Sequence, residues 1–241
     1  VLVDPLTFLA SAYILCRTAI PANAVSLSKR HAWKAELTEF FRLIWTEPSL
    51  RSMNIARALA MAGAGIFNVL LIYYLILILQ GGPATYGYLE ASKSLGFVLA
   101  SGIILPYFLN HFSLRQLYVM GAVLFGGGLV MMSRVDSVGS SCFFYFLSGI
   151  GMCLSLLASS TLYARVSSLA KYARVPAFSQ WSVKLVSLFF MAATYWVVAV
   201  WHWPVKELLA VSGMGPLAGG LYLAFRGKEE PPLTLDGTGV G

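Results

Sequence analysis

Charged residues are scarce in this sequence, and their scarcity decides the class of protein. Asp, Glu, Lys and Arg make up only 11% of the 241 residues, whereas roughly 25% of the residues in soluble domains are charged. Apolar residues make up 58% of the chain. This composition excludes a soluble globular domain and predicts a polytopic membrane protein.

Residues that commonly carry catalysis or bind metals are also few. The three cysteines are too scattered for a disulfide framework or a zinc site, and the three histidines fall outside the long apolar stretches. The sequence has no Walker loop, no His-Glu-x-x-His helix and no Gly-x-Ser-x-Gly elbow. We therefore expect neither an enzyme nor a bound cofactor or metal.

Basic residues outnumber acidic ones by 17 to 10, but they do not form the single stripe of a nucleic-acid surface. They lie between the apolar stretches. The expected partner of this charge is therefore the surface of a lipid bilayer and not a nucleic acid.

Six apolar stretches are long enough, at about 20 residues each, to cross roughly 30 Å of hydrocarbon. The predicted fold is an all-α bundle of six transmembrane helices in a domain of residues 53–227. In three of the spans small residues recur every fourth position, as Ser92, Gly96 and Ala100 do, which predicts close helix packing. The predicted spans are 53–79, 86–109, 117–133, 141–164, 183–201 and 208–225.

The segments that flank this domain are shorter or more polar. Residues 1–16 are apolar but too short for a span, as expected of a transmembrane helix whose beginning is missing. Residues 17–52 are predicted to be a cytoplasmic linker. Residues 228–241, with two adjacent prolines and three glycines, are predicted to be a disordered cytoplasmic tail.

Within the linker, residues 34–45 have the spacing of an amphipathic helix. Apolar residues fall at i, i+3, i+4, i+7 and i+8, with charged residues between them. The pattern predicts a helix that lies on the membrane surface and ends before Pro48. These apolar residues are Leu37, Phe40, Phe41, Ile44 and Trp45.

The distribution of Lys and Arg predicts the orientation of the spans. If the chain alternates across the membrane from residue 17 onward, fourteen of the seventeen basic residues fall on one side. Short loops rich in Lys and Arg stay in the cytoplasm. We therefore expect a multi-pass protein of the inner or plasma membrane with a cytoplasmic C-terminus.

The order of these segments resembles the major facilitator superfamily. Residues 4–11, and Tyr86-Gly87-Tyr88-Leu89 leading to Gly96, are similar to its drug-efflux and siderophore-export branch. Residues 109–115 are similar to the second, degenerate copy of the family's cytoplasmic loop motif. Asn110 and His111 stand where Asp and Arg are usual, and Arg115 closes the motif.

The resemblance implies the carboxyl half of a twelve-helix transporter: the end of helix six, the central loop and helices seven to twelve. It implies two six-helix halves that rock about a site at the membrane midplane, each built from inverted three-helix repeats. Independently, the spans split three and three, at residues 53–133 and 141–225. The implied partner is the missing amino-terminal half of the same transporter.

Ionisable side chains inside a span need a physical reason, because each costs roughly 2.5–3.5 kcal/mol on insertion scales. Glu90 and Lys93 lie at i and i+3 on one helical face and can form a local ion pair. In one interpretation the pair is structural, with Lys93 reaching toward the headgroups. In the other, Glu90 couples transport to protons or binds a cation.

Three further residues are candidates for a substrate or proton pathway. Arg57 either reaches the cytoplasmic surface or contacts a substrate anion or a gate. Asn68, near the middle of its span, either contacts a cavity or hydrogen-bonds to a neighbouring helix. Asp4 either faces a cavity or marks a helix start beside Pro5.

The function predicted from these features is proton-coupled export of a small amphipathic molecule by a secondary active transporter. Two alternatives remain open. The same fold can move lysophospholipids or other lipids, in which case Arg57 meets a phosphate. The chain can also be a non-transporting assembly or sensor subunit.

Overall fold

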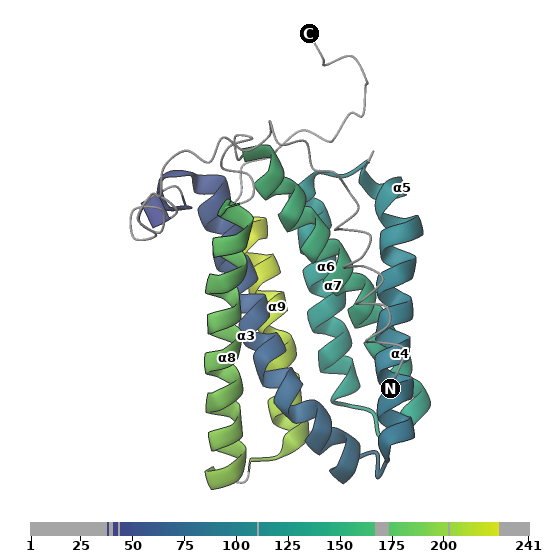
Figure 1. Ribbon diagram of the computed structural model, residues 1–241. Helices are drawn as coiled ribbons and strands as arrows, with labels where there is room; N and C mark the ends of the chain where they lie inside the picture. The colour runs from purple at the N-terminus through teal and green to yellow at the C-terminus, as the bar shows by residue number, and fades with distance from the viewer. Residues whose placement is uncertain are drawn as a thin grey trace, which may run out of the picture. The chain divides into compact units, whose positions relative to one another are not determined.

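The computed structural model describes residues 38, 41–42, 44–109, 111–166, 174–201 and 203–226. From residue 41 onward these residues belong to one compact unit. Every regular element in them is a helix (Figure 1). The helices are α3 (Pro48–Leu77), α4 (Pro83–Leu99), the π-helix η2 (Ala100–Ile104), α5 (Leu105–Leu109), α6 (Leu114–Met132), α7 (Val138–Val166), α8 (Arg174–Trp201) and α9 (Val205–Arg226).

The prediction of six spans is confirmed at the level of helices. Six helices in the described ranges are long and apolar enough to cross a membrane, and α4, η2 and α5 together provide one of them, Pro83–Phe108. Each overlaps one predicted span. The ends differ by a few residues: α3 begins at Pro48, whereas the predicted span begins at residue 53.

Local sequence explains where several helices begin. Pro48 and Pro83 occupy the first turns of α3 and α4. Backbone N–H groups in a first turn have no partner within the helix, so the missing N–H of proline costs no hydrogen bond there. Ser113 caps α6 in a capping box: its Oγ accepts from the Gln116 N–H, and the Gln116 side chain accepts from the Ser113 N–H. Between α3 and α4 the chain turns through Gln80, whose φ is 49°.

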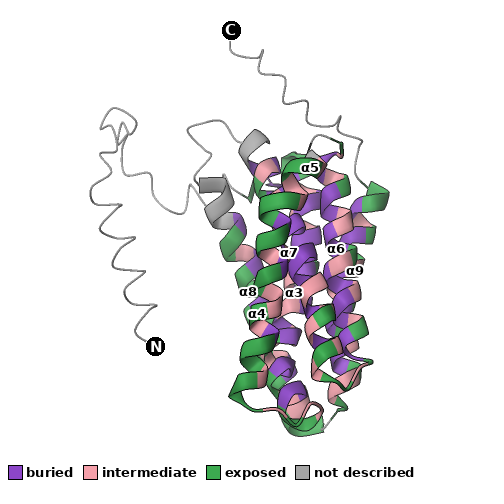
Figure 2. Cartoon of the chain, turned by 90° about the vertical axis from the view of Figure 1, so that its right-hand side faces the viewer, coloured by how far each residue is buried: buried purple, intermediate pink, exposed green. Residues whose placement is uncertain are grey.

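The helices follow one another in space in the order α8, α3, α9, α6, α7, α4 (Figure 1). The most apolar windows of α3, α6, α7 and α9 are 44–50% buried, whereas those of α4 and α8 are only 11% buried. Figure 2, which views the bundle from the α4 side, shows exposed residues along that helix. Four helices therefore form the core, and α4 and α8 flank it.

Glycines allow the helices to approach to backbone contact, and Gly96 among them belongs to the predicted small-residue spacing. A Cβ atom added at Gly63 of α3 would overlap the Ser212 carbonyl of α9, and one at Gly96 of α4 would overlap the Phe146 carbonyl of α7. At Gly149 of α7 it would overlap the Lys93 carbonyl of α4. This last approach brings α4 and α7 together at a charged pair.

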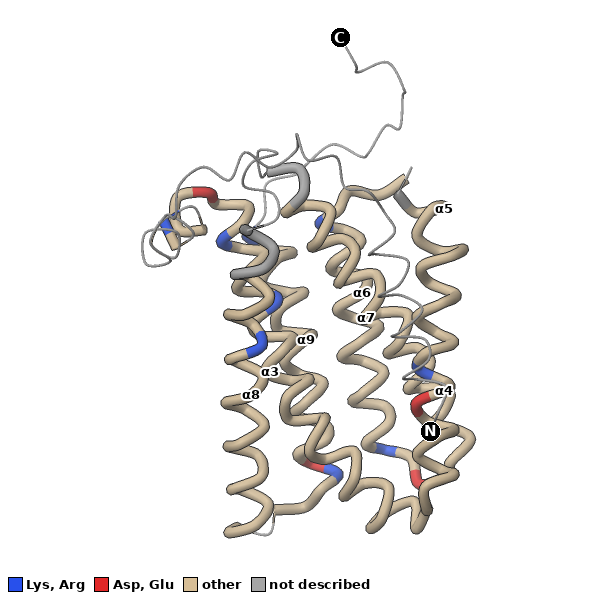
Figure 3. Tube along the Cα trace, viewed as in Figure 1, with Lys and Arg blue, Asp and Glu red and all other residues tan. Residues whose placement is uncertain are grey.

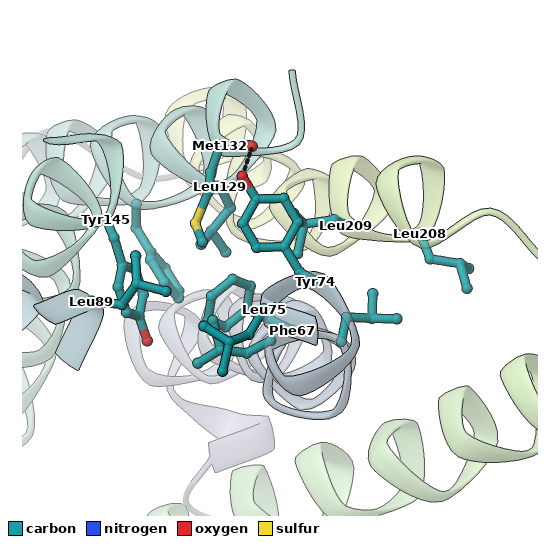
Figure 4. Close-up of a cluster of buried hydrophobic side chains, with 12 residues drawn as sticks. Phe67, Tyr74, Leu75, Leu89, Leu129, Met132, Tyr145, Leu208 and Leu209 are labelled. Atoms are coloured by element: carbon teal, nitrogen blue, oxygen red, sulfur yellow. Dashed lines mark hydrogen bonds between the residues drawn. The ribbon is translucent and has the colours of Figure 1, made fainter. Parts of the chain in front are cut away.

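A cluster of buried apolar side chains fills the end of the bundle where α3 ends and α7 begins (Figure 4). The Tyr74 hydroxyl lies 3.1 Å from the Met132 carbonyl, 2.7 Å from the Val135 carbonyl and 2.8 Å from Ser141 Oγ. This hydroxyl ties α3 to the turn between α6 and α7. A second cluster, around Leu117 and Leu162, fills the opposite end.

The π-helix η2 has a local cause. Pro106 of α5 has no N–H, and its ring would clash with the carbonyl of Gly102, four residues earlier. Widening the turn relieves this clash, and the Leu105 N–H then bonds to the Ala100 carbonyl, five residues earlier.

Candidate functional site

The ion pair predicted between Glu90 and Lys93 is present, and a third residue completes it. Lys93 Nζ forms a salt bridge with Glu90 Oε2. Tyr145 of α7 donates a hydrogen bond to Glu90 Oε1 at 3.0 Å and accepts one from Lys93 Nζ at 3.2 Å. The three side chains form a closed ring of hydrogen bonds between α4 and α7, hereafter the Glu90 ring.

Burial differs within the Glu90 ring. The side chains of Lys93 and Glu90 are 29% and 31% exposed, whereas Tyr145 is only 3% exposed. Gly149 sits one turn beyond Tyr145 and permits the backbone contact that brings Tyr145 to Glu90. The ring therefore pairs two opposite charges within an apolar helix and anchors them on a buried hydroxyl.

Arg57 does not reach the end of its helix; it points into the bundle and is 5% exposed. Its Nη1 donates to Ser179 Oγ of α8 at 3.1 Å, and its guanidinium lies 5.2 Å from the centre of the Tyr163 ring of α7. Ser179 Oγ lies 3.0 Å from Asn54 Oδ1 and 2.9 Å from Tyr163 Oη. This polar network fixes the guanidinium between α3, α7 and α8.

Arg57 also lines a pocket between α3, α6 and α7, hereafter the Arg57 pocket. The space between its walls is about 360 Å³ when the open mouth of the pocket is counted. Arg57 Nη2 is buried and makes no hydrogen bond to any described residue. The lining residues are Arg57, Ala60, Met61, Tyr118, Phe125, Met152, Ser155, Leu156 and Ser159.

The other predicted candidates lie elsewhere. Asn68 is exposed on the surface of α3 and does not line the Arg57 pocket. Asp4 and Asn110 lie outside the described residues, as does most of the predicted amphipathic helix. Of that helix, Ile44 is buried, whereas Phe41 and Trp45 are exposed.

Of the three residues singled out in the loop motif, His111 and Arg115 are described, and both make structural contacts. The His111 ring stacks on Tyr107, and its Nδ1 lies 2.9 Å from the Tyr107 carbonyl. Arg115 donates from Nε to the Leu223 carbonyl at 2.9 Å and from Nη2 to the Ala224 carbonyl. Arg115 thus satisfies carbonyls at the C-terminus of α9, where a cation is also favoured by the helix dipole.

The charged residues at the helix ends follow the predicted asymmetry (Figure 3). Arg51, Arg115 and Arg226 lie at the end where α3 and α6 begin and α9 ends. At the opposite end lie Arg134 and Glu207, and Lys206 is paired with Asp136 at 2.5 Å.

Comparisons with protein-family models, with curated proteins and with solved structures gave no match. Within the described ranges, moreover, no group of three or more His, Cys, Asp or Glu side chains could hold a metal ion. The function therefore has to be argued from the Glu90 ring, the Arg57 pocket and the surface of the bundle.

Sequence reasoning did not assign Tyr118, Tyr163 or Ser179 to a site, and it did not connect Tyr145 with Glu90. All four are polar residues on apolar helices, a pattern that also occurs in ordinary packing. Their roles depend on which helices are neighbours, and that information is absent from spacing along a single helix.

Proposed function

We propose that the protein is a secondary active transporter of the major facilitator type, which exports a small amphipathic molecule in exchange for protons. The observation that carries the proposal is the Glu90 ring, a carboxylate held by a cation and a buried hydroxyl inside a helix of spanning length. Ionisable groups in such positions commonly belong to proton or ion pathways.

The Glu90 ring supports proton coupling because its two charges depend on each other. When Glu90 is ionised, Lys93 and Tyr145 both bond to it. Protonation of Glu90 removes the charge that neutralises Lys93, so the contact between α4 and α7 is weakened. A proton thereby changes the relative stability of two helix arrangements, which is what coupling by alternating access requires.

The helix contacts support the inverted three-helix repeats. If α3, α4 and α6 are matched in order with α7, α8 and α9, each helix has neighbours that correspond to those of its match. For example, α3 packs on α8 and α9, and its match α7 packs on α4 and α6. Because α3 and α7 run in opposite directions, this match corresponds to an inverted repeat.

Contacts of glycines in α6 have counterparts in contacts of glycines in α9, the helix matched with it. Gly126 of α6 and Gly213 of α9 each lie against the other's carbonyl. Two positions further on, Gly128 meets the Phe144 carbonyl of α7. Gly215 likewise meets the Leu59 carbonyl of α3.

The surface of α4 and η2 supports a second six-helix bundle as partner. Its exposed residues include a stripe of small side chains, and a Cβ atom added at Gly87 or Gly102 would meet nothing within 4 Å. Small residues allow close helix contact within a bilayer. We propose that the amino-terminal half of the transporter packs against α4 and α8. The stripe consists of Gly87, Ala91, Ser94, Ser101 and Gly102.

The charge asymmetry of the helix ends supports a cytoplasmic C-terminus, because Lys and Arg accumulate on the cytoplasmic side. The proposed location is the inner or plasma membrane. Exposed Phe41 and Trp45, which precede α3, suit the interface between headgroups and hydrocarbon.

A flux assay with a matched variant tests the proposal. The complete gene product that carries these 241 residues is reconstituted in liposomes that enclose a pH indicator, with ethidium and carboxyfluorescein as cationic and anionic probes. We expect an imposed pH gradient to drive flux of at least one probe, and Glu90→Gln to reduce this flux at least tenfold. Glu207→Gln, the same change at an exposed site at the end of the bundle, leaves it within twofold.

Two results would count against the proposal. Absence of flux for both probes under every gradient would overturn transport. Flux that is equal in the wild type and in Glu90→Gln would overturn proton coupling through the Glu90 ring.

A further inference from the structure

The Arg57 pocket combines an apolar wall with a buried hydrogen-bond donor that has no partner among the described residues. This donor is Arg57 Nη2, in a residue that is 5% exposed. Tyr118, whose hydroxyl is a second potential donor, is 1% exposed. Both side chains line the same pocket, one from α3 and one from α6.

A buried guanidinium without an opposite charge is unfavourable, and buried charges in proteins are normally paired. The ion pairs among the described residues join Lys93 to Glu90 and Lys206 to Asp136, and no described carboxylate pairs with Arg57. An anion from outside the chain would supply the missing charge.

The surroundings hold Arg57 in place for such a ligand. Ser179 accepts from Nη1, Tyr163 lies beside the guanidinium, and Asn54 binds both hydroxyls. These contacts leave Nη2 without a hydrogen-bond partner among the described residues. A side chain that is already ordered loses less entropy on binding, so this arrangement favours affinity.

We propose that the Arg57 pocket binds the head of an amphipathic anion, with one carboxylate or phosphate group on Arg57 Nη2 and Tyr118 Oη. Arg57 Nη2 can donate to one oxygen of such a group in a charge-assisted hydrogen bond, and the Tyr118 hydroxyl can donate to another. The apolar part of the ligand lies along Phe125, Met152 and Leu156. This inference rests on the proposed function, because it names the chemical class of the substrate.

Competition binding tests this inference without requiring transport. The complete gene product is placed in nanodiscs of zwitterionic lipid, and bound radiolabelled decanoate is measured against empty nanodiscs. Unlabelled decanoate and decyl phosphate should compete. Decanol and decyltrimethylammonium, which share the chain but lack the negative charge, should compete at least tenfold more weakly.

Variants assign the binding to the pocket. Arg57→Met should weaken decanoate binding at least tenfold, and Tyr118→Phe, which removes only the hydroxyl, should weaken it several-fold. Arg57→Lys should fall between wild type and Arg57→Met, because it keeps the charge but loses the fork of donors. Lys184→Met, which removes an exposed charge on α8, should bind within twofold of wild type.

The inference is overturned if decanol competes as well as decanoate, or if Tyr118→Phe and Arg57→Lys both bind like the wild type. Because these two changes are conservative, they remain informative if Arg57→Met fails to fold. Stronger competition by lysophosphatidylglycerol than by decanoate would identify a lipid headgroup as the source of the anion. The opposite order would identify a free carboxylate.

Binding and flux separate this inference from the proposed function. Binding of decanoate that depends on Arg57, without flux of any probe, keeps the anion site and rejects transport. Flux driven by a pH gradient, with no decanoate binding that depends on Arg57, keeps the transporter and rejects the anion site.

Discussion

A charged pair inside an apolar helix is stable only while both charges are present. Lys93 and Glu90 neutralise each other, and Tyr145 bonds to both. Removing one partner leaves the other as an unpaired charge, whereas removing both leaves neutral side chains. The two substitutions should therefore be strongly coupled.

We expect Glu90→Gln or Lys93→Met alone to lower the free energy of unfolding by about 2 kcal/mol. This is less than the roughly 3–5 kcal/mol for breaking a fully buried pair, because both side chains keep partial exposure. The double variant should recover at least half of the loss, since the amide oxygen introduced by Glu90→Gln can still accept from Tyr145. The free energies of unfolding of the wild type, the two single variants and the double variant are measured in mixed micelles. If the loss in the double variant equals the sum of the two single losses, the coupling is contradicted.

At the residue scale, the sequence predicts local pairs better than distant ones. Glu90 and Lys93 lie three residues apart, so the helix alone brings them together. Tyr145 joins them only because α4 packs on α7. The interpretation in which Arg57 reaches the surface is wrong because it considered depth along α3 alone, whereas Ser179 and Tyr163 of other helices bind the guanidinium.

Where two helices cross, glycines let the backbone of one helix contact the other directly, and these contacts position the helices. In α9, Pro216 leaves the Ser212 carbonyl without its usual partner within the helix. A Cβ atom at Gly63 would overlap this carbonyl and the Pro216 ring. The crossing of α3 and α9 therefore depends on the absence of a side chain at Gly63.

We expect Gly63→Ala to lower the free energy of unfolding by about 1–3 kcal/mol, the usual range for overpacking. Gly127→Ala in α6 is the matched control, because an added Cβ atom there meets nothing within 4 Å. It should leave stability unchanged or raise it by up to about 1 kcal/mol, because alanine favours a helix more than glycine does. Unfolding in mixed micelles measures both, and equal effects would contradict the role of Gly63.

At the element scale, length and apolarity suffice to predict six helices because a bilayer demands about 20 apolar residues per span. The start of α3 lies earlier than predicted because Pro48 begins a helix whose first turn is polar and resembles a linker in composition. The π-helix η2 has no signature in apolar spacing. Its cause, Pro106, looks in the sequence like an ordinary helix breaker.

On the scale of the whole molecule, the two ends of the bundle differ in charge. Arg51, Arg115 and Arg226 lie at one end, and Asp136 neutralises Lys206 at the other. The proposed orientation places the first of these ends in the cytoplasm.

We expect cysteine labelling to show this orientation. In a background without Cys16, Cys142 and Cys153, a membrane-impermeant maleimide added to intact cells should label Ser137→Cys. His111→Cys at the opposite end should react only after the membrane is opened. Both native residues are exposed, so access within the protein does not differ. Labelling in the reverse order would contradict the orientation.

The widened turn at Ala100–Ile104 has a consequence for how one span meets its neighbours. Each residue of an α-helix turns the chain by about 100°, so the extra residue rotates everything after it by that amount. Before this turn, Gly96 and Ala100 face α7. Beyond it, Leu105 still packs against α7 residues, and Leu105 and Phe108 also pack against a cluster to which the start of α6 contributes. The widened turn thus lets one span keep its contact with α7 while its end adds a contact near α6.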